Sequence, residues 1–223
     1  MCGRYSLTSA PEAMRQLFDL DGPLLNLQPR YNIAPTQDAP IIRAADGGKR
    51  ELAMLRWGLV PSWSKDGPDS GYSMINARAE TVADKPAYRS AFRDKRCLVP
   101  ADGFYEWKKE GKAKQPFRFT MADGAPFLLA GLWERWRRPD GSDLQSFTII
   151  VTTPNPLVAQ VHDRMPVILD RAGAAQWLAG SSRDALLALL VPFPAERMAA
   201  TMVSKRVNSP ANDDPSLIEP ISA

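Results

Sequence analysis

Short hydrophobic runs, separated by turn signals, recur along most of the chain and predict β-strands rather than long helices. Turn sequences at 110–112 (EGK), 123–124 (DG) and 139–141 (PDG) predict hairpins between some of these strands. The expected strands lie near residues 2–7, 40–43, 51–57, 72–75, 97–100, 103–108, 117–121, 127–134, 145–152 and 198–203.

Helical patterns are fewer and shorter. The clearest runs from about Pro11 to Leu20, where Met14, Leu17 and Phe18 share one face. Further helices are expected near 156–161, 171–178 and 182–190, and residues 22–37 are expected to form an irregular loop. Twenty prolines disfavour long helices. Together the elements predict an α+β fold, with a curved, mostly antiparallel, barrel-like sheet and flanking helices.

Composition adds limits to this picture. A chain of 223 residues with 44% hydrophobic and 24% charged positions is typical of a globular protein, and we expect one domain over residues 1–223. A net charge of +3 is mild, so any nucleic-acid site is local. The N-terminus does not resemble a signal peptide, and no segment is long and apolar enough to span a membrane. We therefore expect a cytoplasmic, DNA-associated protein that does not bind membranes.

Metal and disulfide chemistry have little support. The two cysteines, Cys2 and Cys97, form no disulfide framework, and with a single histidine they do not complete a zinc site. Cys97 lies among apolar residues and is expected to be a buried core thiol. We expect no metal and no organic cofactor.

Cys2 is the most informative single position. Removal of Met1 would leave a 1,2-aminothiol, whose α-amine has a pKa of about 7.7–8.0 against about 10.4 for lysine. Such an amine can attack an aldehyde to form a Schiff base, and the thiol can then close a thiazolidine ring. Two alternatives remain open from this residue alone. Cys2 could be an ordinary terminal residue, or the nucleophile of an N-terminal-nucleophile amidohydrolase.

Six segments, in this order, resemble the SOS-response-associated peptidase family, whose members are also called abasic-site processing proteins. They are 1–5 (MCGRY), 31–36 (YNIAPT), 56–63 (RWGLVPSW), 75–81 (INARAET), 96–107 (RCLVPADGFYEW) and 162–166 (HDRMP). The resemblance implies an enzyme that removes its own Met1 and then forms a covalent thiazolidine cross-link with abasic sites in single-stranded DNA. It implies a catalytic group made of Cys2, Asn76, Glu106 and His162. Weak lyase activity through the Schiff base is also expected, and monomer is the default oligomeric state.

Each proposed helper of Cys2 has suitable chemistry and an ordinary alternative. Strand alternation places Glu106 on the face of Phe104, and burial of that face would raise the carboxyl pKa toward the range useful for proton transfer. His162 is the only imidazole in the chain. Asn76 offers both a donor and an acceptor. The alternatives are a solvated glutamate, a surface histidine and a turn asparagine.

Several residues are candidates for DNA contact. Arg78 and Arg164 each lie two positions beyond a proposed catalytic residue, so in extended backbone they would point the same way and could bind phosphate. Arg4 could join them. The family often has a basic residue near position 86, where this chain has proline, so Lys85 or Arg89 could replace it.

Aromatic and proline residues complete the candidate DNA site. Trp57 and Trp63 flank a Gly-Leu-Val-Pro-Ser loop and could stack on bases, although either could be a core residue instead. Pro35 is expected to shape the pocket wall near Cys2. A non-covalent single-stranded DNA binder remains an alternative to the cross-linking enzyme.

Overall fold

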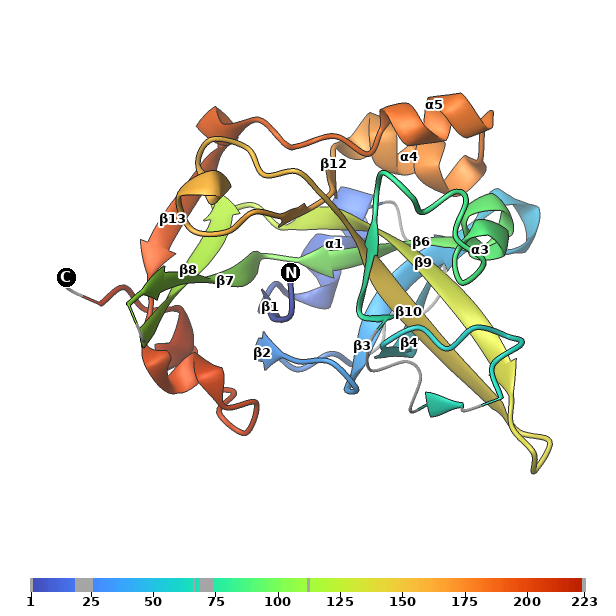
Figure 1. Ribbon diagram of the computed structural model, residues 1–223, viewed down its shortest axis with the longest axis horizontal. Helices are drawn as coiled ribbons and strands as arrows, with labels where there is room; N and C mark the ends of the chain where they lie inside the picture. Colours follow the sequence, from blue (N-terminus) through green and yellow to red (C-terminus); the bar gives the residue numbers. More distant parts are fainter. Residues whose placement is uncertain (1, 19–25, 66, 69–73, 112, 222–223) are drawn as a thin grey trace.

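A computed structural model describes residues 2–18, 26–65, 67–68, 74–111 and 113–221, and it consists mainly of two β-sheets (Figure 1). The five-stranded sheet has the order β13 (Met198–Met202), β8 (Ala113–Met121), β7 (Gly103–Glu110), β1 (Tyr5–Leu7) and β2 (Arg30–Ile33). The eight-stranded sheet contains β3 (Asp38–Ala44), β4 (Arg50–Trp57), β5 (Asn76–Arg78), β6 (Arg96–Ala101), β9 (Phe127–Arg137), β10 (Asp143–Thr152), β11 (Met165–Pro166) and β12 (Ile168–Leu169).

The eight-stranded sheet closes on itself. Strand β10 pairs with β4 on one side and with β9 on the other. Strands β3 and β6 complete the ring, because β3 pairs with both β4 and β6, and β6 pairs with β9. Within this ring only the β10–β4 pairing is parallel. The predicted α+β fold with a curved, mostly antiparallel, barrel-like sheet is therefore confirmed.

The helices are short. They are α1 (Pro11–Phe18), α3 (Arg89–Asp94), α4 (Arg171–Ala179) and α5 (Arg183–Ala188), with single 3₁₀ turns η1 (Asp46–Gly48), η3 (Val158–Gln160), η4 (Ala195–Arg197), η5 (Lys205–Asn208) and η6 (Pro215–Ile218). Helices α3 and α4 pack against the outside of the barrel. Trp177 of α4 is fully buried, donates its indole N–H to the Cys97 carbonyl, and packs edge-on against Phe92 of α3. This contact fastens two helices to the barrel wall. No helix in the described residues is long and apolar enough to cross a membrane.

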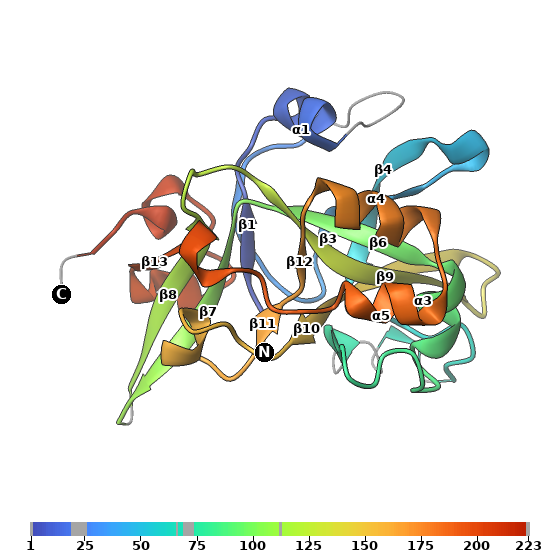
Figure 2. The ribbon, with the colours of Figure 1, turned by 90° about the horizontal axis from the view of Figure 1, so that it is seen from above.

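The five-stranded sheet buries strand β1 and Cys2 in the interior of the protein. Strand β1 lies between β7 and β2, and the long β7–β8 hairpin extends away from the barrel (Figure 2). Tyr5 pairs with Phe104, and the Tyr105 N–H donates to the Arg4 carbonyl at 3.0 Å, so the pairing continues toward Cys2. The residues that precede β1 therefore run along β7.

Most expected elements form close to their predicted bounds, but three predictions are wrong and one helix was not expected. The 22–37 loop contains β2, whose Tyr31 and Asn32 N–H groups are bound by the distant Asp213 carboxylate. The charged stretch after Tyr88 forms helix α3. The turn at 123–124 joins no hairpin, because β8 and β9 belong to different sheets. The helix expected at 156–161 is only the single 3₁₀ turn η3.

Two further predictions fall partly outside the described residues. The strand expected at 72–75 includes residues 72–73, which are not described, and the strand that forms nearby is β5, at Asn76–Arg78. The last two positions of the helix expected at 11–20 are also not described, and α1 itself spans Pro11–Phe18.

Candidate active site

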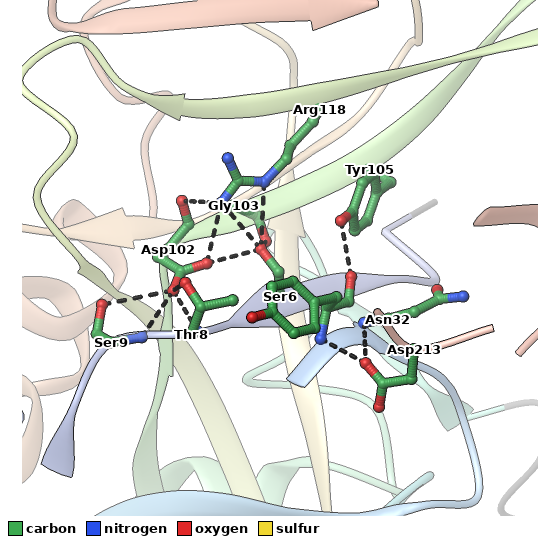
Figure 3. A network of polar contacts seen from close by, with 10 residues as sticks. Ser6, Thr8, Ser9, Asn32, Asp102, Gly103, Tyr105, Arg118 and Asp213 are labelled. Carbon is green, nitrogen blue, oxygen red and sulfur yellow. Dashed lines mark hydrogen bonds and ion pairs between the residues drawn. The ribbon is translucent and has the colours of Figure 1, made fainter. Parts of the chain in front are cut away.

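A buried polar network fixes strand β1 in place (Figure 3). Asp102, at the junction of β6 and β7, accepts hydrogen bonds from the hydroxyls of Ser6 and Thr8, both at 2.7 Å. It also forms an ion pair with Arg118 of β8, whose Nη2 lies 3.0 Å away. The Asp102 and Arg118 side chains are only 6% and 14% exposed, so the pair is shielded from solvent. This network links β1 to β7 and β8, and so sets where Cys2 lies.

Cys2 is completely buried beside β7. Its Sγ lies 4.0 Å from the Arg4 carbonyl oxygen. Burial raises the pKa of the Cys2 thiol, and the negative charge of Glu106 raises it further. The thiol is therefore neutral at pH 7, and the carboxyl of Glu106 is close enough to influence it.

Glu106 lies on β7, and its side chain is 2% exposed. Phe104, on the same face of the strand, is also buried, which confirms that this face points inward. Burial raises the pKa of Glu106 to about 7. The predicted rise of the Glu106 carboxyl pKa toward neutrality thus follows from its burial, and the part of this residue in proton transfer stays a prediction.

His162 lies on the loop between η3 and β11, and its Nε2 is 3.7 Å from Oε2 of Glu106. Its Nδ1 accepts the Arg164 N–H at 3.1 Å, so in the neutral ring the proton sits on Nε2, facing Glu106. Burial lowers the pKa of His162, although Asp163, with Oδ1 3.1 Å from Nδ1, acts in the opposite direction. The neutral imidazole is therefore the main form at pH 7.

Asn76 begins β5, and its Nδ2 lies 3.5 Å from the Ile149 carbonyl of β10. Its Oδ1 is buried and accepts no hydrogen bond from any described residue. The structure thus brings Cys2, Glu106 and His162 together, but joins Asn76 to none of them through a hydrogen bond among the described residues. The unpaired Oδ1 remains an acceptor for an incoming donor.

A cavity of about 420 Å³ opens onto Glu106 and His162. Its lining residues are Glu106, Trp107, Lys109, Lys114, His162 and Asn208. Four of these, Trp107, Lys109, Lys114 and Asn208, were not among the site residues predicted from the sequence. The two lysines belong to a visible basic run, which could have identified them, whereas Asn208 reaches the site only through folding of the C-terminal segment. A cavity of about 440 Å³ lies elsewhere, between the 121–128 turn, α4 and the 193–197 segment, and none of the proposed catalytic residues lines it.

Three candidate DNA contacts are exposed. Arg78 and Arg89 are both at the surface, and the side chain of Trp63 is 62% exposed. Pro35 is half-buried in the turn that follows β2. These positions are accessible to a ligand, and their role in DNA binding stays a prediction.

Two arginines already have partners within the protein. Arg4 donates to Oδ1 of Asn32 at 3.0 Å and to the Val207 carbonyl at 2.7 Å. Arg164 forms an ion pair with Glu80. Both side chains are held in fixed positions, and a phosphate would have to share their charge with these partners.

The expectation that Trp57 stacks on DNA bases is wrong. Trp57 is completely buried, and its indole N–H donates to the Ile75 carbonyl at 3.0 Å. Tyr5 packs edge-on against it and Phe147 stacks on it, with ring centroids 5.2 and 6.2 Å away. Its position at the end of a barrel strand turns the side chain into the core.

Comparisons with known proteins find similar sequences and structures over most of this chain. The family model described as "SOS response associated peptidase (SRAP)" matches residues 1–210. The abasic site processing protein YoqW of Bacillus subtilis is 45% identical, over 98% of this chain and 99% of its own. The abasic site processing protein YedK of Escherichia coli is 30% identical over 99% and 100%, and HMCES of Xenopus tropicalis is 33% identical over 96% and 77%. A crystal structure of a protein from Bacteroides thetaiotaomicron superimposes with a TM-score of 0.87 at 30% identity, over 99% of this chain and 100% of that one.

Proposed function

The chain belongs to the SOS response associated peptidase family, and from this we propose that it processes abasic sites in single-stranded DNA by a covalent cross-link to Cys2. The observation that carries the proposal is the grouping of the buried Cys2 with Glu106 and His162, of which Glu106 and His162 line one cavity. A cysteine nucleophile, a carboxyl with a pKa near neutrality and an imidazole N–H are the groups that aldehyde capture needs.

The first step is hydrolysis of the Met1–Cys2 peptide bond. Until that bond is cleaved, the Cys2 nitrogen is an amide and cannot form a Schiff base. Glu106 is the group we assign to proton transfer in this hydrolysis, because its raised pKa leaves it partly protonated and partly ionised at pH 7.

The second step joins the Cys2 amine to the open-chain aldehyde of the abasic sugar. The amine adds to the carbonyl carbon, and loss of water gives the imine. In the proposed site, Glu106 or His162 delivers the proton that allows water to leave. The side-chain oxygen Oδ1 of Asn76 orients the amine in this proposal by accepting a hydrogen bond from it.

The third step is addition of the Cys2 sulfur to the imine carbon. The thiol proton moves by way of Glu106 to the imine nitrogen, and a five-membered thiazolidine ring results. The same imine can instead lose the 3′ phosphate by β-elimination, which would appear as weak lyase activity.

The test is incubation with a single-stranded oligonucleotide that carries one abasic site, followed by a denaturing gel. The wild-type protein should give a shifted band, and Cys97→Ala, which removes the other buried thiol, should give the same band. Cys2→Ala should give none. Cys2→Ser keeps the amine but lacks the thiol, so its adduct should survive only after borohydride reduction. A wild-type band that persists in Cys2→Ala would refute the proposal.

Self-removal of Met1 has a separate readout. Intact-mass measurement of purified Glu106→Ala should show retained Met1, whereas the wild type should lack it. Complete removal in Glu106→Ala would assign the cleavage to a cellular aminopeptidase instead.

A further inference from the structure

The outer part of the β7–β8 hairpin carries a concentrated positive charge next to the cavity. We propose that Lys109 and Lys114 form a phosphate-binding pair that holds the phosphodiester backbone of the DNA strand beside Cys2. The inference rests on the proposed function for the identity of the ligand, and it adds the direction in which the strand leaves the site, along the hairpin arm.

Charge density is the first observation. Residues 108–114 contain four lysines and one glutamate, a formal charge of +3, which equals the net charge of the entire chain. The hairpin projects from the body of the protein (Figure 2). Such a local excess of charge favours an anionic partner, since charge of one sign raises the local concentration of the opposite sign.

Strand register is the second observation. Lys109 is directly opposite Lys114 in the antiparallel pairing of β7 and β8. Like charges in this arrangement destabilise a sheet, because the opposed side chains start only about 5 Å apart. Neither lysine forms an ion pair with a side chain that the structure describes. A bound phosphate would remove the repulsion.

Location is the third observation. Both lysines line the cavity onto which Glu106 and His162 open. Lys109 is near enough to His162 that its positive charge adds to the effect of burial on the pKa of the imidazole. Every abasic nucleotide within a strand has a phosphodiester on each side, so a phosphate on this pair would flank the sugar that reacts with Cys2.

The neighbouring Lys108 provides a matched control. It lies on the same strand and is also exposed, but it is opposite Gln115 and does not line the cavity. Removal of its charge changes the net charge of the hairpin by the same amount as removal of the charge of Lys109.

The experiment is equilibrium binding of a fluorescent single-stranded oligonucleotide with a tetrahydrofuran abasic analogue, which has no aldehyde and cannot cross-link. Wild type, Lys109→Gln, Lys114→Gln and Lys108→Gln are compared at salt concentrations on either side of about 0.1 M. Removal of one lysine–phosphate interaction should lower the slope of log affinity against log salt by about 0.7, and weaken binding about fivefold near 0.1 M salt. We expect this for Lys109→Gln and Lys114→Gln, and a clearly smaller effect for Lys108→Gln.

Equal effects of the three substitutions would overturn the inference, as would no effect at the paired lysines. Thermal unfolding of each variant checks that the exposed substitutions leave the fold intact. Because the analogue cannot cross-link, this result does not depend on Cys2. Failure of the wild type to cross-link a true abasic site would refute the proposed function separately.

Discussion

The burial of Glu106 predicts that this residue reduces the stability of the fold at neutral and alkaline pH. Its pKa is raised from 4.5 to about 7 because the folded protein shields the carboxyl from water. Glu106→Gln removes the ionisable group with little change of shape. We therefore expect the variant to be inactive in cross-linking and yet more stable than the wild type at pH 8.

The magnitude follows from the difference between the two pKa values. Below pH 4.5 the carboxyl is protonated in both the folded and the unfolded chain, so its ionisation does not affect the free energy of unfolding. Between pH 4.5 and about 7 the unfolded chain releases a proton that the folded protein still holds, and the free energy of unfolding falls as pH rises. Above about pH 7 the carboxyl is ionised in both the folded and the unfolded chain, and the free energy of unfolding stays lowered by the full amount. A difference of about 2.5 pKa units corresponds to about 3 kcal/mol.

The assay is urea denaturation of wild type and Glu106→Gln at pH 4.5, 6 and 8. The stability advantage of Glu106→Gln should be small at pH 4.5 and grow to about 3 kcal/mol at pH 8. Glu134→Gln serves as a control, because Glu134 is similarly buried but forms an ion pair with Lys95. Its substitution should destabilise the protein, since it leaves Lys95 without its partner. A pH-independent difference between wild type and Glu106→Gln would refute the reasoning about burial.

The remaining predictions concern the polar network around β1, the barrel core and the DNA contacts. Asp102→Ala should lower the free energy of unfolding by about 3–5 kcal/mol in urea denaturation, because it leaves the Arg118 guanidinium buried without its partner. The double variant Asp102→Ala with Arg118→Met should recover part of the lost free energy of unfolding, because it also removes the buried charge of Arg118. Trp57→Ala should cost about 3–5 kcal/mol of stability, whereas Trp63→Ala should change stability by less than about 0.5 kcal/mol. In a binding titration with single-stranded DNA, Trp63→Ala should weaken affinity by about 1–3 kcal/mol if the exposed ring stacks on one base.

Hydrophobic runs and turn signals in the sequence predicted those elements that are determined mainly by the residues of the segment itself. The barrel strands were placed within a few residues because their hydrophobic runs and turn signals are contained in the segments themselves. Strand β2 was missed because its backbone partners come from β1 and from Asp213, which lies about 180 residues away in the sequence. Helix α3 was missed because four of its six residues are charged or polar, and only Ala91 and Phe92 are buried. Such elements are stabilised by tertiary contacts that a sequence window does not contain.

In the candidate site, too, some features could be predicted from the sequence, and others depend on tertiary contacts. Cys2 stood out by its terminal position, whereas Glu106 was selected through the family resemblance, and strand alternation predicted only that it shares a face with Phe104. The 3.7 Å distance between Nε2 of His162 and Oε2 of Glu106 could not be foreseen, because it depends on where the loop after η3 lies relative to β7 in the folded protein. For Trp57, the sequence offered both a core and a stacking role, and closure of the barrel decided in favour of the core.

Burial of Cys2 also bears on the order of bond formation in the proposed reaction. After removal of Met1, the residue carries two nucleophiles that compete for one aldehyde. An α-amine with a pKa of about 7.7–8.0 has an appreciable free-base fraction at pH 7. The thiol does not ionise there, because burial and the charge of Glu106 both raise its pKa. The amine should therefore attack first, and the thiol should react only when the imine carbon is held within reach and Glu106 can take its proton. A buried thiol is thus an advantage for this chemistry, since it directs the first bond to nitrogen and keeps the sulfur for ring closure.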